Sequence, residues 1–380
     1  MWWNSTETKE RGNRSASPIP LELPGVAGWK EVPIKEKGEP LVALGPFSDH
    51  REIETDAIYF GQRVNSPYMV NELNGEEPLT GSLLTMFVRE SVAKQLMEAQ
   101  RLLPKGMYLA VWEPYRTLEV QQSLFDTYYN ALKAQHPDWS EDALLTETQR
   151  YVSLPSTVPA RPSPHNTGGS VDVSIFKLPP KIDQQVSDIN TRLTKLTDGD
   201  WEIAYKMEME KIDLINQYSQ LLEFGAPLDH GGEKAGLNYY ERLATLRELT
   251  PEEIAARDNR RLLYNIMKEV GFEPYEDEFW HYNSKKSQMG AKSAGLPYAE
   301  FGAAKLSPKN LEHEKMRREH RLGTLRLKSG EWGANLTLQA ISPEYAKQFE
   351  AAQKAAIGHP DIRDSKWPMA EIIKPPEEKK

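Results

Sequence analysis

Residues 163–172, which read SPHNTGGSVD, carry a histidine and a carboxylate at a spacing that suits a metal site. His165 follows a proline-rich loop, two glycines allow the backbone to turn tightly, and Asp172 points from one face of an alternating strand. These two side chains can converge on one ion, and both donor types suit Zn²⁺. A loop histidine that caps a turn and an aspartate paired at a strand edge explain the spacing equally well.

Residues 278–282, which read EFWHY, place two ionisable side chains in an aromatic segment that we expect to be buried. A carboxylate in an apolar pocket has a raised pKa, which suits a base that takes a proton from metal-bound water. Residues three apart in a regular strand face opposite sides, so Glu278 and His281 share a site only if the strand bulges or ends there. A core histidine bonded to a backbone carbonyl is the alternative for His281.

Residues 113–117, which read EPYRT, lie between an expected strand and an expected helix. An arginine held at such a turn can clamp a carboxylate with two hydrogen bonds or stabilise a developing oxyanion. Arg116 is therefore a third candidate, although arginines of this kind are more commonly surface residues.

The composition narrows the chemistry and the partners. There is no cysteine, which excludes disulfides, thiolate metal sites and thiol nucleophiles, so His, Asp and Glu must hold any metal. A formal net charge of −9 argues against nucleic acid as a partner. No apolar run reaches the roughly 18–20 residues of a membrane span. The N-terminus lacks the pattern of a signal peptide, so we expect a cytoplasmic protein, with a processed periplasmic form left open.

Hydrophobic periodicity indicates which elements position these residues. Apolar residues at helical spacing predict helices over residues 83–103, 117–132, from 140, and 250–270. Buried runs predict strands over residues 107–112, 171–176 and 272–282. We expect an inserted pair of solvated helices over residues 181–222, and charged helices and loops after residue 290.

The other histidines lie in less promising places. Four occur in charged or helix-end contexts, where we expect them on the surface, namely His136, His313, His320 and His359. His50 lies in a polar lead-in, and His230, in a glycine-rich loop, is ambiguous.

Taken together and in order, the motifs resemble those of the D-alanyl-D-alanine dipeptidases of the VanX type. That zinc peptidase family also holds D,D-carboxypeptidases and peptidoglycan endopeptidases. Its pattern is a Tyr-Arg turn, then Ser-x-His-x-x-Gly-x-x-x-Asp, then Glu-x-x-His followed by Tyr. Residues 115–116, 163–172 and 278–282 match it at every defined position.

The resemblance implies a role for each matching residue. His165, Asp172 and His281 would hold one zinc ion per chain, Glu278 would be the general base, and Arg116 would stabilise the tetrahedral transition state.

Three further residues would bind the substrate by the same resemblance. Asp229, in the segment FGAPLD at residues 224–229, would hold the substrate ammonium, Ser163 would contact a substrate terminus, and Tyr115 would also contact the substrate.

The expected partner is a small peptide that contains D-amino acids. A free dipeptide requires a negative charge near its ammonium, which favours a dipeptidase over a D,D-carboxypeptidase or an endopeptidase. A non-catalytic, zinc-stabilised binding protein is the alternative of another class, but a structural site needs neither Glu278 nor Arg116. The sequence leaves the oligomeric state open.

The expected fold is α+β, with a small, mainly antiparallel sheet flanked by helices. We expect an extended lead-in over residues 1–50 and a zinc peptidase domain over residues 51–290, with the helical insertion at 181–222. A C-terminal extension then covers residues 291–380.

Overall fold

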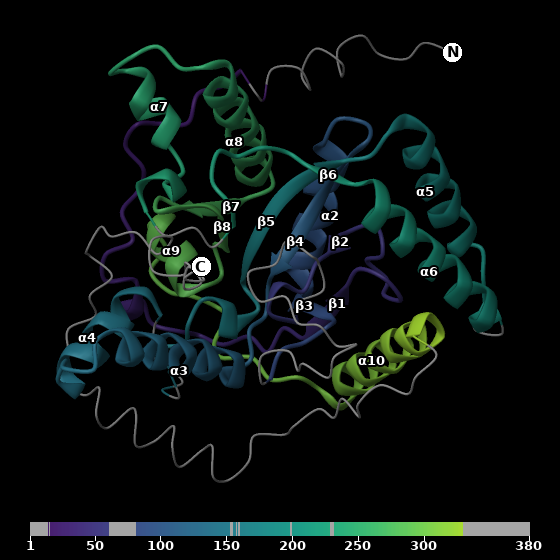
Figure 1. Cartoon of the computed structure of the whole chain (residues 1–380), viewed down its shortest axis with the longest axis horizontal. Coiled ribbons are helices and arrows are strands. Elements are labelled where there is room, and N and C mark those ends of the chain that lie inside the picture. The colour runs from purple at the N-terminus through teal and green to yellow at the C-terminus, as the bar shows by residue number, and fades with distance from the viewer. Residues whose placement is uncertain are drawn as a thin grey trace, which may run out of the picture.

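The computed structural model describes residue 14 and residues 16–60, 81–152, 155–156, 158, 160–197, 200–228 and 232–329. The described residues form a mixed α/β fold around a six-stranded, mainly antiparallel sheet (Figure 1). The expected α+β class, with a small sheet flanked by helices, is confirmed. Among the described residues, no helix is both long enough and apolar enough to cross a membrane.

The central sheet brings the predicted site segments onto neighbouring strands. Its order is β2 (Glu54–Thr55), β4 (Met107–Glu113), β5 (Ser170–Lys177), β8 (Glu278–Ser284) and β7 (Phe272–Tyr275). The short strand β6 (Gln220–Leu221) pairs with the end of β5, and only β2 with β4 is a parallel pair among these. A separate sheet pairs β1 (Leu41–Leu44) with β3 (Met86–Arg89).

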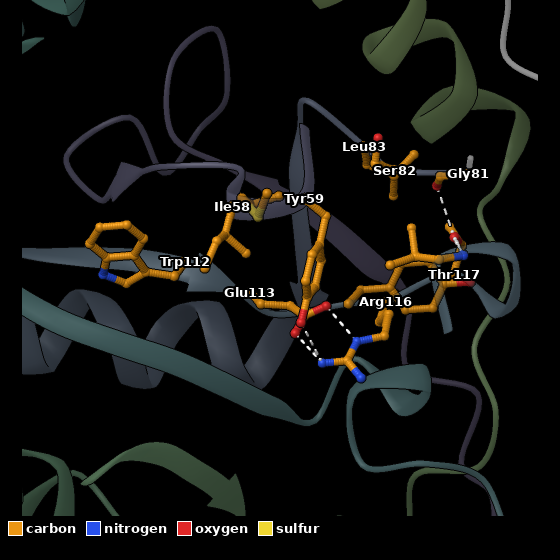
Figure 2. Close-up of a pocket in the computed structure, with 12 residues that line it drawn as sticks. Ile58, Tyr59, Gly81, Ser82, Leu83, Trp112, Glu113, Arg116 and Thr117 are labelled. Atoms are coloured by element: carbon orange, nitrogen blue, oxygen red, sulfur yellow. Dashed lines mark hydrogen bonds and ion pairs between the residues drawn. The ribbon is translucent and has the colours of Figure 1, made fainter. Parts of the chain in front are cut away.

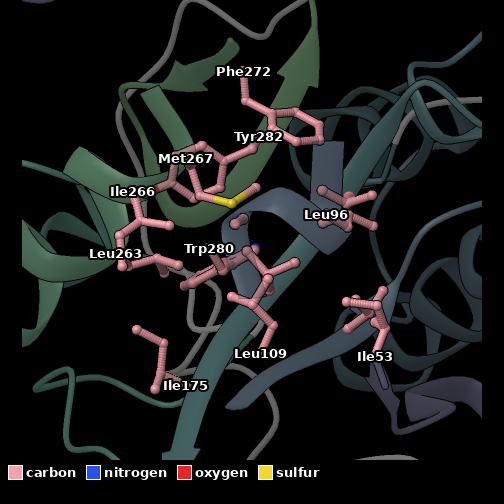
Figure 3. Close-up of a cluster of buried hydrophobic side chains, with 14 of the residues drawn as sticks. Ile53, Leu96, Leu109, Ile175, Leu263, Ile266, Met267, Phe272, Trp280 and Tyr282 are labelled. Atoms are coloured by element: carbon pink, nitrogen blue, oxygen red, sulfur yellow. The ribbon is translucent and has the colours of Figure 1, made fainter. Parts of the chain in front are cut away.

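Both faces of the sheet are covered by helices, because both sets of alternating side chains are buried. On one face, α2 (Glu90–Leu102) and α8 (Pro251–Glu269) pack against side chains such as Leu109 and Ile175 (Figure 3). On the other face, α3 (Leu118–Gln135) and the pair α5 (Pro180–Leu193) and α6 (Trp201–Tyr218) pack against Ala110 and Phe176. The predicted helical pair is therefore present, but the expectation that it is solvated is wrong, because Ile182, Val186 and Ile215 pack on the sheet.

Three of the predicted helices start at residues with local capping chemistry. Thr117 accepts a hydrogen bond from the Val120 N–H and starts α3, and Ser140 does the same for α4 (Glu141–Tyr151). Thr250 and Glu253 form a reciprocal capping box that starts α8.

Two predicted elements are wrong in detail. The helix expected over residues 83–103 begins only at Glu90, because residues 86–89 form strand β3 instead. That segment is fully buried, and periodicity alone does not separate a short buried strand from a helix. The single strand expected over residues 272–282 is a hairpin, in which β7 ends at Tyr275 and β8 starts at Glu278.

The outer segments of the chain also contribute structure. Within the expected lead-in, residues 41–44 form β1, Trp29–Glu31 form a 3₁₀ turn, and Ile19 is buried. After the central hairpin come α9 (Gln288–Ser293) and α10 (Pro308–Ser329), and α7 (Tyr239–Ala244) precedes α8. Further 3₁₀ turns are η2 (Ile58–Phe60), η4 (His165–Thr167) and η6 (Glu233–Ala235).

One histidine expected on the surface is not there. His313, on α10, is half-buried, and its ring meets that of Phe87 edge-on with 6.4 Å between the centroids. The contact arises because α10 packs on the small sheet, a long-range arrangement that local charge patterns do not reveal. His320 has no described side chain, and His230 and His359 lie outside the described residues.

Candidate metal centre

Neighbouring strands place Asp172 and His281 side by side. Asp172 of β5 lies directly opposite His281 of β8 in the antiparallel register. Directly opposite residues of such a pair point to the same face of the sheet, so the two side chains meet. Asp172 Oδ1 lies 2.9 Å from His281 Nδ1.

The loop before β5 brings His165 to the same place. His165 starts η4, and its carbonyl accepts the Arg116 N–H at 3.2 Å. Gly168 closes the turn at φ 68°, a left-handed conformation in which any other residue would be strained, and a Cβ there would lie 2.4 Å from Leu41 Cδ2. Arg89 fixes the loop to β3. Its Nε donates to the Thr167 carbonyl, and its backbone N–H donates to the Gly168 carbonyl.

The three donor atoms are spaced for a small metal ion. His165 Nε2 lies 3.2 Å from His281 Nδ1 and 3.6 Å from Asp172 Oδ1, and all three residues are buried. Donor atoms about 2.0–2.1 Å from a tetrahedral ion lie roughly 3.3 Å from one another. The group therefore fits a metal ion, and two imidazoles with one carboxylate are a donor set that zinc accepts.

Outer hydrogen bonds select the ring nitrogens that face this point. His165 Nδ1 lies 2.9 Å from the Pro114 carbonyl, and His281 Nε2 lies 3.2 Å from Asn283 Oδ1. Both partners are acceptors, so protons on these outer nitrogens leave His165 Nε2 and His281 Nδ1 unprotonated. Those two lone pairs then face the Asp172 carboxylate, and a cation between them would stabilise such a group of acceptors.

Glu278 lies beside the centre because β8 is irregular. In the β7–β8 pair, Pro274 lies opposite Tyr282, but the next residue, Tyr275, lies opposite Glu278. Strand β8 therefore contains extra residues at this point. This irregularity meets the geometric condition for Glu278 and His281 to share a site, and Glu278 Oε2 lies 3.7 Å from His281 Nδ1. The Glu278 side chain is 40% exposed, so it lies at the edge of the site and not in the closed apolar pocket that we expected.

Side-chain hydrogen bonds hold Arg116 in place, close enough to Asp172 for the two charges to interact. Its Nε donates to Glu113 Oε1 at 2.5 Å, and Nη2 donates to Glu113 Oε2 and to the Tyr59 hydroxyl. Its Nη1 donates to Gln121 Oε1 at 2.7 Å. Burial alone would lower the pKa of Arg116, but Glu113, Tyr59 and Asp172 together outweigh it and hold this pKa well above the usual value. Arg116 is therefore a fixed, permanent positive charge.

A bulge in β4 explains why Glu113 can hold Arg116 next to the metal centre. The β4–β5 register shifts between Val111 and Glu113, so Glu113 pairs with Asp172. Glu113, Asp172 and His281 therefore form one row across three strands. The extra residue, Trp112, lies on this same face, where its Nε1 donates to Ser174 Oγ, two residues after Asp172 in β5.

The predicted substrate-binding residues have different placements. Ser163 is buried two residues before His165. The Tyr115 hydroxyl donates to the Ala304 carbonyl at 3.2 Å, and its ring packs against a cluster that includes Phe87. Asp229 lies outside the described residues.

A pocket lies beside Arg116. Figure 2 shows the Glu113–Arg116 ion pair on one side of it and Ser82 and Leu83 on another. Ile58 and Tyr59 also line the pocket. Arg116 lines the pocket, and its backbone N–H donates to the His165 carbonyl, so this residue links the pocket to the loop of the candidate metal centre.

Several residues around the site were not predicted from the sequence. Glu113, Tyr59, Gln121 and Asn283 hold the predicted residues in place. Glu113 had a local signal, since it lies three residues before Arg116 within the same motif. The other contacts depend on the fold and leave no pattern in the sequence.

Comparison with known proteins gives a distant match. No protein-family model matches the chain. The chain is similar to the D-alanyl-D-alanine dipeptidase of Synechocystis sp. (strain ATCC 27184 / PCC 6803 / Kazusa), with 22% identity over 270 residues. The match covers 66% of this chain and 84% of that protein. This distant similarity supports, at the level of the family, the resemblance that the motifs indicate.

Proposed function

We propose that the chain is a zinc-dependent peptidase that hydrolyses D-Ala-D-Ala. The observation that carries the proposal is the convergence of His165, Asp172 and His281, with Glu278 at its edge. The distant similarity to a D-alanyl-D-alanine dipeptidase supports the choice of substrate. In this proposal the three residues are the ligands of one zinc ion per chain.

A zinc ion at this centre would supply a Lewis acid for the scissile carbonyl and lower the pKa of a bound water. The Glu278 carboxylate takes the proton from the attacking water and then delivers it to the leaving amine. Its partial exposure suits this work, because Oε2 lies 3.7 Å from His281 Nδ1 while the side chain remains accessible from solvent. Glu278 is therefore the proton carrier of the proposed reaction.

Arg116 would stabilise the negative charge that develops on the carbonyl oxygen. Since Glu113, Gln121 and Tyr59 already fix the guanidinium, little reorganisation is needed when that charge appears. Asp229 would bind the substrate ammonium, and Ser163 and Tyr115 would contact the peptide. These three substrate-binding roles follow from the motif resemblance.

A peptide panel tests the proposal. Zinc-loaded protein is incubated with D-Ala-D-Ala, L-Ala-L-Ala and a pentapeptide that ends in D-Ala-D-Ala, and the released alanine is measured. We expect rapid release from the D,D-dipeptide alone, and loss of that release when a chelator is added. Release from the pentapeptide would instead indicate a D,D-carboxypeptidase. No release from any of the three would contradict the proposal and favour an endopeptidase or a zinc-stabilised binding protein.

A further inference from the structure

Helix α10 carries a carboxylate that is completely buried. Glu314 is 0% exposed, and its two oxygens accept the backbone N–H groups of Leu84 and Thr85 at 2.8 and 2.7 Å. A buried carboxylate is costly unless it is paired and hydrogen-bonded, so this contact determines where α10 lies. The two N–H groups directly precede β3, and α10 accordingly packs beside the small sheet (Figure 1).

Arg318, one helical turn later, completes the contact. Its Nε donates to Glu314 Oε1 at 2.6 Å, and its Nη2 donates to the Ser82 carbonyl. Its guanidinium also lies over the ring of Phe60, 5.1 Å from the ring centroid. Two side chains of one helix thus hold the backbone at residues 82–85 and the end of η2.

These two segments form the wall of the pocket beside Arg116. Ile58 and Tyr59 of η2 line one part of it, and Ser82 and Leu83 line another (Figure 2). Ser82 Oγ is buried and has no hydrogen-bond partner among the described residues, so it is a polar atom that a ligand could use.

We propose that Glu314 and Arg318 are positioning residues that set the shape of this pocket, and so the peptide side chain that fits beside Arg116. In this way the predicted C-terminal extension takes part in substrate selection. The role in substrate selection rests on the proposed peptidase function. The contact between α10 and the pocket wall is independent of that function. The candidate metal ligands lie on η4, β5 and β8, so a change in α10 can alter selectivity without altering metal binding.

The first measurement is hydrogen exchange in the full chain. Glu314→Gln keeps the shape of the side chain, but its NH₂ group replaces one carboxylate oxygen and cannot accept a hydrogen bond, so one of the two backbone N–H groups loses its partner. We expect faster exchange in the peptides that cover residues 82–88 and unchanged exchange in β5 and β8. The matched control is Glu312→Gln, an exposed carboxylate on the same helix, which should leave the exchange of both regions unchanged.

The second measurement is substrate selectivity, with zinc content determined in parallel. We expect the ratio of kcat/KM for D-Ala-D-Ala to that for D-Ala-D-Phe to fall about tenfold in Glu314→Gln, because a loosened wall admits the larger side chain. Bound zinc should remain at the wild-type level. Arg318→Lys, which keeps the charge but loses the planar fork, provides a milder variant if Glu314→Gln does not fold.

The two measurements separate the possible failures. Faster exchange with an unchanged selectivity ratio would overturn the positioning role, and so would an equal loss of activity on both dipeptides. Unchanged exchange at residues 82–88 would overturn the contact itself, whatever the enzyme acts on. If the wild-type protein cleaves neither dipeptide, the proposed function fails, and the exchange data alone decide whether α10 holds the pocket wall.

Discussion

At the scale of single residues, the proton positions of the two site histidines decide what the site can hold. The Pro114 carbonyl and the Asn283 side chain both accept hydrogen bonds from outer ring nitrogens. The inner nitrogens then face each other and Asp172, at distances that suit a shared metal ion. The site therefore depends on these outer partners as well as on the three candidate ligands.

Replacing Asn283 tests this dependence. In Asn283→Ala, the His281 ring loses the partner of its Nε2, so we expect zinc affinity to fall by roughly 10- to 100-fold. The affinity is measured by competition with a chromophoric chelator. His136→Ala, on a ring that stacks on Trp139 away from the site, is the control and should bind zinc as the wild type does. An unchanged affinity in Asn283→Ala would show that the orientation of His281 does not require this hydrogen bond.

Replacing the proposed base separates catalysis from metal binding. Glu278→Gln removes the proton carrier but keeps the size of the side chain, so we expect kcat to fall about 10²- to 10⁴-fold. Bound zinc, measured by mass spectrometry of the native protein, and the melting temperature should remain at wild-type values. Retained turnover in this variant would contradict the proposed role of Glu278.

At the scale of elements, the sequence predicted best where the decisive chemistry is local. The caps at Thr117, Ser140 and Thr250 require only neighbouring residues, and the helices they start are present. Strand β3 and the β7–β8 hairpin were mistaken because their identity depends on pairing partners far along the chain. The same holds for His313, whose local context is polar although α10 places it against the small sheet.

The placement of His313 predicts a pH-dependent stability. Burial lowers the pKa of His313 to about 4, and Arg317 and Lys309 act in the same direction while Asp49 opposes them. Because this pKa lies below the ordinary value of 6.5, the unfolded chain binds the proton more readily than the folded chain. The contribution to stability is therefore complete above pH 6.5 and is lost progressively as the pH falls towards 4.

Urea unfolding at a series of pH values measures this contribution. We expect the free energy of unfolding of the wild type to decrease between pH 6.5 and 4 more steeply than that of His313→Phe. The phenylalanine variant keeps an aromatic ring against Phe87 but has no group that titrates. Equal slopes for the two proteins over this range would contradict the expectation.

At the scale of the whole molecule, the sequence motifs located the candidate site but not its support. Three segments far apart in the chain, around residues 116, 165 and 281, were expected to act together, and the sheet does bring them together. The register that aligns Glu113, Asp172 and His281 depends on irregularities in β4 and β8, which cannot be predicted from residue spacing. The pocket wall likewise depends on α10, more than 200 residues after the segment that it holds.

Removing the metal tests how far the site stabilises the molecule. The centre joins η4, β5 and β8, and zinc that binds the folded chain alone would stabilise it by about 2.7 kcal/mol at a hundredfold excess over Kd. We expect a chelator to lower the melting temperature and abolish peptide hydrolysis, and zinc to restore both. A melting temperature unaffected by chelator and by added zinc would indicate that no metal ion binds at this centre.

The most direct test of the central claim is X-ray absorption at the zinc edge of the purified, zinc-loaded protein. The structure predicts one ion per chain with two imidazole nitrogens and one carboxylate oxygen at about 2.0–2.2 Å, and a remaining position filled by water. His165→Ala should remove one imidazole from the spectrum. A wild-type spectrum without two imidazoles, or one that His165→Ala leaves unchanged, would contradict the assignment of His165, Asp172 and His281 as the metal centre.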